Sequence, residues 1–221
     1  HLSQIRGKLR MTATRLRQSQ AGVAMIEFAY TAPFLILLLG GGVELANYSI
    51  AHMRISQVAV SLADNASRAK QGVISGVPRM REVDVNEAFH AAGLQGVDLD
   101  LQSNARLILS SIEVNAQGGQ WIHWQRCFGN ANFESTFGEQ GDGASGTTIA
   151  GIGPAGRQVA AEPGFAVMFV EVVYNYQPIM MERVIGRQPI RKTAAMLVRD
   201  QRDLAAGIAN PAPAAPINSC A

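Results

Sequence analysis

The sequence predicts an α+β protein in which one long N-terminal helix precedes a mostly antiparallel sheet. Three observations lead to this fold class. A long apolar run follows a basic N-terminus, and apolar residues at helical spacing continue well beyond that run. The segments typical of strands all lie in the second half of the chain, which separates the helical part from the sheet.

Length and charge limit the functions open to the chain. Its 221 residues suit one domain with appendages, and a hydrophobic fraction of 48% is enough for a sizeable core. A net charge of +2 indicates no nucleic-acid partner. Residues 1–22 hold five basic side chains and no acidic one, whereas the remainder holds 14 basic and 17 acidic side chains. This asymmetry predicts a cytoplasmic N-terminus, with the bulk of the chain on the other side of a membrane.

The apolar run predicts one transmembrane helix. No charged residue occurs from Phe28 to Val43, and the run extends less strongly to Val23 and Ile50. Because a span needs about 20 mostly apolar residues, we place it at about 25–50, within a helix over 23–70.

Two features interrupt the predicted span. Pro33 removes the hydrogen bond to the carbonyl of Ala29 and is expected to kink or loosen the helix. Gly40, Gly41 and Gly42 weaken helix propensity but allow close approach of another backbone. We interpret the glycines as a flexible or tightly packed point.

Beyond the span, a stripe of residues predicts that the helix continues with one buried face. Members of the stripe recur at steps of three and four residues. They are Leu45, Tyr48, His52, Ile55, Ala59, Leu62, Ala66 and Ala69. We interpret His52, which lies on the stripe, as a packed histidine.

The rest of the chain, residues 71–221, is expected to form the domain that contains the sheet. Asp84–Ala92 has helical character, and residues 117–120 are typical of a hairpin turn. We interpret the Gly-rich residues 129–157 as a surface loop and residues 206–221 as an extended Pro/Ala tail. Further expected elements are strands at Ala105–Val114, Trp121–Arg126 and Gly164–Tyr176, a short helix at Ile179–Ile185, and a strand or helix at Arg191–Arg199.

One carboxylate, Glu27, lies near the start of the apolar run, where insertion of a charge costs about 3 kcal/mol. It is the fifth residue after Gly22, and Phe28 follows it. This arrangement resembles the processing site of type IV pilin-like precursors, most closely that of the Flp and TadE-like branch of Tad (tight-adherence) pilus systems. Near the other end, Tyr174, Tyr176 and Pro178 similarly resemble the Tyr-x-Tyr-x-Pro strand end of TadE-like proteins.

The resemblance implies a pseudopilin-like subunit of the bacterial inner membrane with a periplasmic domain. A prepilin peptidase would remove residues 1–22 by cutting after Gly22, and the new amine of Val23 would pair with Glu27 of an adjacent subunit. The implied partners are the major Flp pilin and other TadE-like minor pilins. An alternative stays open: an ordinary signal anchor, with Glu27 snorkelling to the interface, in an uncleaved scaffold or receptor protein.

Export of the domain makes a disulfide between Cys127 and Cys220 the favoured state, because a free cysteine on an extended tail is a liability. Two free or intermolecular thiols are the alternative.

We expect no enzyme, cofactor or metal site. Gly141, Gly143 and Gly146 form a G-x-G-x-x-G pattern, and a second begins at Gly151, yet neither lies between a strand and a helix. The four histidines are scattered without metal-ligand spacing, and no G-x-S-x-G motif is present.

Overall fold

The computed structural model describes residues 21–69, 76–180 and 182–220, without the side chains of residues 21, 184 and 185. Residues 1–20 of the predicted leader, and Lys70 at the predicted end of the long helix, lie outside the described residues. The described helices are α2 (Ala21–Arg68), α3 (Glu82–Gln95), the 3₁₀ turn η1 (Val97–Leu99), α4 (Leu101–Asn104) and α5 (Glu182–Ile185). The strands are β1 (Ala105–Val114), β2 (Gln120–Phe128), β3 (Val167–Asn175) and β4 (Pro189–Leu197).

The chain divides into two compact units, His1–Ala46 and Asn47–Ala221. Helix α2 belongs to both, so the boundary between these units lies inside a helix. The reason is packing: residues of α2 from Ala51 to Ala66 are part of the core of the second unit.

The second unit is built on a four-stranded antiparallel sheet with the order β2-β1-β3-β4. The turn before Gly119 closes the β1–β2 hairpin, and Gly118 adopts a φ of 86°, which favours glycine. The predicted α+β class with an antiparallel sheet is confirmed.

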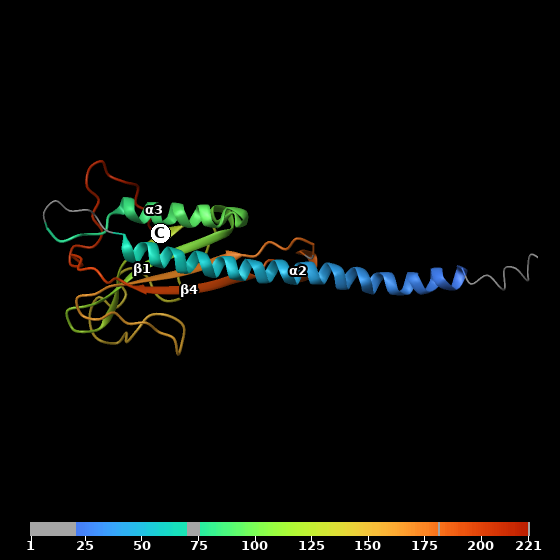
Figure 1. Ribbon diagram of the computed structural model, residues 1–221. Coiled ribbons are helices and arrows are strands. Elements are labelled where there is room, and N and C mark those ends of the chain that lie inside the picture. Colours follow the sequence, from blue (N-terminus) through green and yellow to red (C-terminus); the bar gives the residue numbers. More distant parts are fainter. Residues whose placement is uncertain (1–20, 70–75, 181, 221) are drawn as a thin grey trace, which may run out of the picture. The chain divides into compact units, whose positions relative to one another are not determined.

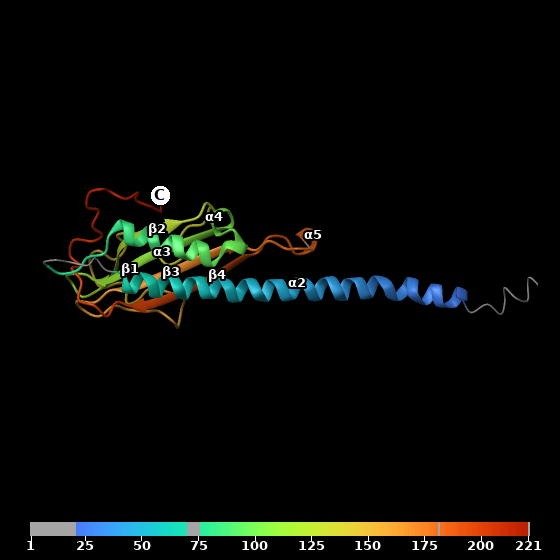
Figure 2. The same cartoon turned by 45° about the horizontal axis from the view of Figure 1, so that its top comes forward.

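Helices cover one face of the sheet. Figures 1 and 2 show α3 and the second half of α2 beside the strands, and side chains from both helices share one core with β1 and β3. In this core Phe89 of α3 stacks on Phe128 of β2, with ring centroids 5.7 Å apart. Tyr48 of α2 packs edge-on against Tyr176, just after β3. Helix α3 thus covers the β2 side, and α2 covers the β3–β4 side.

The predicted stripe on α2 is confirmed for most of its members. Ile55, Ala59, Leu62 and Ala66 are fully buried, whereas Leu45 is exposed and lies in the first unit. The buried face is also wider than the stripe, because it faces both the sheet and α3. It additionally includes Ala51, Val58 and Ala63.

The Gly-rich residues 129–157 form no helix or named strand and are mostly exposed, but part of the segment is anchored on the sheet. Ile152 and the following Ala161 pack on Ile112, Ile122 and Phe169, which point from the second face of the sheet. The segment therefore covers this face with irregular backbone, where hydrophobic periodicity could not indicate burial.

A buried carboxylate holds this covering segment on the sheet. Glu171 of β3 is only 1% exposed and accepts hydrogen bonds from the backbone N–H of Thr136, at 3.0 Å, and from the Thr136 hydroxyl. Arg191 of β4 lies 3.0 Å from the same carboxylate and over the ring of Phe133. Burial of the Glu171 charge is offset by these donors.

Other elements differ from their predictions mainly at the ends. The helix expected at Asp84–Ala92 extends to Glu82–Gln95. Of the strand or helix expected at Arg191–Arg199, the structure shows a strand, β4. The helix expected at Ile179–Ile185 is limited to its last four residues.

The C-terminal tail covers the edge of β2, where it runs beside α3 (Figure 2). The backbone N–H of Cys127 donates to the carbonyl of Asn218, at 2.8 Å, and Asn86 of α3 donates to the carbonyl of Pro216. The disulfide Cys127–Cys220 fastens the end of the tail, which confirms the predicted bond. Arg106 donates to the carbonyl of Cys220 at 2.9 Å.

Leu62→Ala is expected to lower the free energy of unfolding by about 2–5 kcal/mol, because it leaves a cavity where α2 meets the sheet. Val60→Ala on the same helix is the matched control, since Val60 is 45% exposed and its truncation should change stability by no more than about 0.5 kcal/mol. Urea unfolding of the full chain in detergent, followed by fluorescence of Trp121 and Trp124, measures both. Equal losses in the two variants would contradict the packing of α2.

Cys220→Ser is expected to destabilise the second unit by up to about 4–5 kcal/mol, since the bond closes a long loop in the unfolded chain. It should also expose the tail to limited proteolysis, whereas Ser219→Ala should not. Non-reducing peptide mapping of the wild-type chain should recover the linked cysteines. Alkylation of both thiols without prior reduction would contradict the bond.

Candidate functional site

The residues predicted to form a processing site all lie in the first two turns of described α2. Gly22, Val23, Glu27 and Phe28 are exposed to the surroundings of the helix. Val23 and Glu27 are four residues apart, so the structure places them on the same face, one turn from each other. Gly22 and Phe28 each lie one residue outside this pair and point elsewhere around the helix.

Gly22 has no packing reason to be glycine within the described chain. A Cβ built on it would meet no atom within 4 Å, and the residue is helical. Glycine in a helix costs about 1 kcal/mol relative to alanine. The same holds for Gly41 and Gly42, around which a Cβ would also find open space. Packing within the described chain therefore does not require glycine at these positions.

The first part of α2 presents apolar side chains all around its axis. Among the described residues, one helix is long and apolar enough to cross a membrane, and none of its apolar window is buried in the protein. Glu27 is the single charge between Ala21 and Val43. A helix that is apolar on every side is typical of a span in lipid. The exposed large residues include Phe28, Tyr30, Phe34, Leu35, Ile36, Leu37, Leu38 and Leu39.

Helix α2 continues through Pro33, which frees the carbonyl of Ala29 from its usual partner. Two residues before Pro33, the Thr31 hydroxyl donates to the carbonyl of Glu27, at 2.9 Å, and lies 3.3 Å from that of Phe28. The hydroxyl is thus satisfied within the helix, as is required in an apolar medium.

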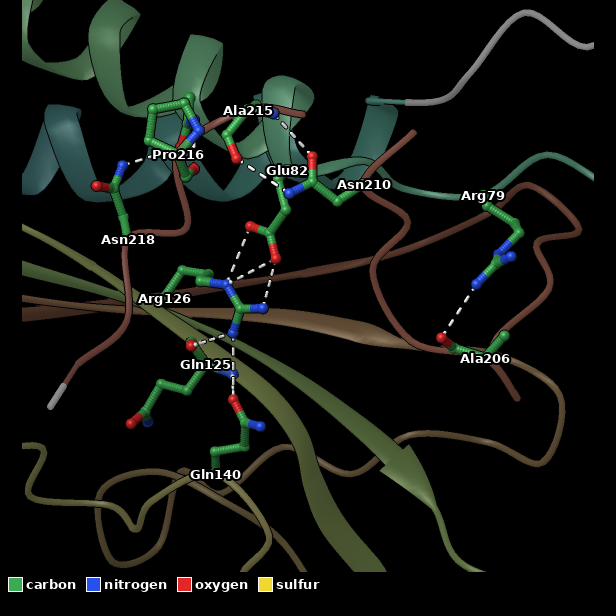
Figure 3. Close-up of polar contacts among 11 residues, drawn as sticks. Arg79, Glu82, Gln125, Arg126, Gln140, Ala206, Asn210, Ala215, Pro216 and Asn218 are labelled. Atoms are coloured by element: carbon green, nitrogen blue, oxygen red, sulfur yellow. Dashed lines mark hydrogen bonds and ion pairs between the residues drawn. The ribbon is translucent and has the colours of Figure 1, made fainter. Parts of the chain in front are cut away.

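In the second unit, the strongest charged contact is structural. Figure 3 shows the Arg126 guanidinium of β2 facing the Glu82 carboxylate of α3, with Nε 3.1 Å from Oε1 and 3.0 Å from Oε2. Arg126 also reaches the side-chain oxygen of Gln140 in the covering segment. Both members of the pair are nearly buried, so the contact ties α3 and residue 140 to the edge of the sheet.

Ser111, Glu113 and His123 form a hydrogen-bonded group that contains the residue types of a hydrolase triad. The Ser111 hydroxyl, however, donates to Glu113 Oε1 at 2.8 Å, and His123 Nδ1 lies 2.8 Å from Glu113 Oε2. The order of contacts differs from that of a Ser-His-acid triad, because the carboxylate lies between the serine and the histidine. Burial raises the pKa of the Glu113 carboxyl, an effect that its two hydrogen-bond partners oppose.

The glycine patterns have a structural explanation. Gly143 adopts a φ of 75°, and a Cβ there would lie 2.2 Å from the carbonyl of Gln120. Gly129 is confined in the same way by the carbonyl of Ala105. These glycines let irregular backbone lie against the sheet, and no helix follows them within the described covering segment. Across residues 21–69, 76–180 and 182–220, no group of three or more His, Cys, Asp or Glu side chains could hold a metal ion.

Sequence reasoning missed two charged residues that fix the fold. Arg202 is buried beyond the end of β4 and donates to the carbonyls of Ser67 and Ala66, where α2 ends. It thereby satisfies carbonyls that a helix terminus leaves open. Arg126, which pairs with Glu82, is the other. Neither arginine belongs to a local motif, so only the folded contacts reveal its role.

Comparison with known proteins gives one family match. Residues 22–64 match the family model described as TadE-like protein. The match covers 43 of the 221 residues, all within α2, and its first residue is Gly22. Comparison with curated proteins and with solved structures found no match.

The matched segment holds all four residues of the predicted processing site. TadE-like proteins are components of pilus assembly and not enzymes, and the match confirms the resemblance seen in the sequence. Residues 22–64 of helix α2 are therefore similar to TadE-like proteins.

Proposed function

We propose that the chain is a minor pilin or pseudopilin that takes part in assembly of a Tad/Flp type IV pilus. The observation that carries this proposal is the family match that begins at Gly22 and continues along α2 to residue 64. The apolar surface of the first part of α2 supports it, because such a surface suits both the bilayer and packing against other pilin helices.

A prepilin peptidase processes the chain after Gly22 in this proposal. Gly22 is exposed and has open space around it, so packing within α2 does not require a glycine at this position. A peptidase that accepts only the smallest residue before the cut bond would require glycine at this position. The cut would make Val23 the first residue of the mature chain.

The new N-terminus would give Glu27 a partner. A carboxylate in lipid is costly unless a positive group reaches it, and the Val23 amine lies one turn away on the same face. Because this face is exposed, the Val23 amine of a neighbouring subunit can also approach Glu27. Attraction between the two charges is strong in a medium of low dielectric constant, which makes the pair suitable for holding subunits in register.

The proposed topology has the basic N-terminus in the cytoplasm, α2 through the inner membrane, and residues 47–221 in the periplasm. The charge asymmetry across the apolar run supports this orientation. The Cys127–Cys220 disulfide also fits an oxidising compartment. Its proposed partners are the major Flp pilin and other TadE-like minor pilins.

One observation favours a second candidate, an uncleaved membrane-anchored scaffold or receptor in the periplasm. Ala21, Gly22 and Val23 are all helical, so the bond after Gly22 lies within regular helix, which also suits an uncut signal anchor. In that protein Glu27 would reach the interface by snorkelling. Removal of the leader distinguishes the two candidates.

Gly22→Leu is expected to leave the precursor uncut in cells that contain the peptidase, because a large side chain then precedes the cut bond. Gly42→Leu is the matched control, since Gly42 lies in the same helix with equally open surroundings. Immunoblots of membrane fractions should show the longer chain for Gly22→Leu and the shorter chain for Gly42→Leu. Equal processing of the two variants would refute cleavage at this glycine.

Glu27→Gln is expected to be inserted and cleaved but to lose most co-assembly, since the change keeps the size of the side chain and removes its charge. Glu27→Asp keeps the charge and should retain part of the assembly. Leader removal is followed by immunoblot, and co-purification with the major pilin or other minor pilins is measured after crosslinking. Normal co-purification of the Gln variant would show that Glu27 is a snorkelling residue.

A further inference from the structure

The segment between β3 and β4, residues 176–188, lies at the end of the second unit where the chain enters it from the apolar run. Asn47, the first residue of this unit, donates to the Tyr176 hydroxyl oxygen at 2.7 Å, and Tyr48 packs on the Tyr176 ring. Asn47 is four residues beyond Val43, the last residue of the uncharged run, a rise of about 6 Å along the helix. Connectivity alone therefore brings this segment close to the surface of the membrane that α2 is proposed to cross.

Two large apolar side chains stand exposed on this segment. Ile179 and Met180 are 63% and 64% exposed and are adjacent in sequence. The base of the segment is held in place, because Gln177 donates to the side chain of Asn104 and to the carbonyl of Asn175. In water, this exposure forgoes the favourable burial of two large apolar side chains.

Basic side chains accompany the apolar pair. The segment contains one acidic and two basic residues, and Arg183 and Arg187 are both exposed. Glu182 lies 3.3 Å from Arg187 Nε and compensates one positive charge, which leaves the segment net positive. Exposed apolar residues beside arginines are typical of segments that lie in the interface of an anionic bilayer.

We propose that Ile179, Met180, Arg183 and Arg187 form a bilayer-contact surface that binds the anionic lipid surface next to the span. Ile179 and Met180 enter the interface, and the two arginines contact lipid phosphates. The contact gives the second unit a second attachment to the membrane and so limits how it can tilt about α2 before assembly. The inference rests on the proposed membrane placement of α2.

The test uses the full chain in vesicles of phosphatidylglycerol and phosphatidylcholine. The acyl chains of the phosphatidylcholine are brominated. Bromine quenches tryptophan fluorescence at short range, so a Met180→Trp chain reports contact with the acyl region. Val77→Trp is the matched control, because Val77 is also exposed but follows the far end of α2. The quenching of the wild-type chain is subtracted from that of each variant. The remaining quenching should be at least about twofold greater for Met180→Trp than for Val77→Trp.

Adding Arg183→Gln and Arg187→Gln to the Met180→Trp chain should reduce this quenching, as should vesicles without the anionic lipid. Equal quenching of Met180→Trp and Val77→Trp in chains that float with the vesicles would overturn the bilayer-contact surface and leave the membrane span intact. A third outcome would identify a protein contact and would also overturn the bilayer-contact surface. In that outcome, quenching of Met180→Trp stays at the level of the control, and the new tryptophan becomes shielded from solvent only after pilin subunits are added. Failure of the chain to float would overturn the membrane placement and this inference with it.

Discussion

One constraint governs the molecule: a single helix must satisfy two different environments along its length. From Phe28 to Val43, α2 carries no charge and exposes large apolar side chains, and from Ala51 to Ala66 it buries one wide face against the sheet and α3. A helix can make this change because its backbone hydrogen bonds are internal and only the side-chain pattern need differ. The apolar run and the domain therefore share one continuous helix, and the second compact unit begins inside it at Asn47.

The rest of the second unit completes the burial that α2 begins. The helices cover one face of the sheet, the irregular Gly-rich segment covers the other, and the tail closes the β2 edge. Buried charges link these layers, through Glu171 to the covering segment and through Glu82 and Arg126 to α3. Breaking one partner of such a pair leaves an uncompensated charge, which makes these contacts specific as well as stabilising. A domain closed in this way exposes few strand edges to neighbouring chains.

Local signals in the sequence were sufficient for much of this fold. The 3.6-residue stripe predicted the buried face of α2, the residues of β1 were predicted to their ends, and the cysteine pair was predicted from export. Other features have no local signal. The covering segment has no hydrophobic periodicity, and Arg202 contacts the end of α2 from far along the chain. The choice between strand and helix for β4 depended on its pairing with β3. The processing site stays a prediction, because the partner that would act on Gly22 belongs to another protein.

The central claim is that this chain is a processed pilin-like subunit and not a permanent anchor. The most direct test is the intact mass of the wild-type protein purified from the membranes of its own cells, with the disulfide left unreduced. The account predicts a chain that begins at Val23, with Cys127 and Cys220 joined. A protein that retains Gly22 and the basic residues before it would contradict the account and identify α2 as a signal anchor.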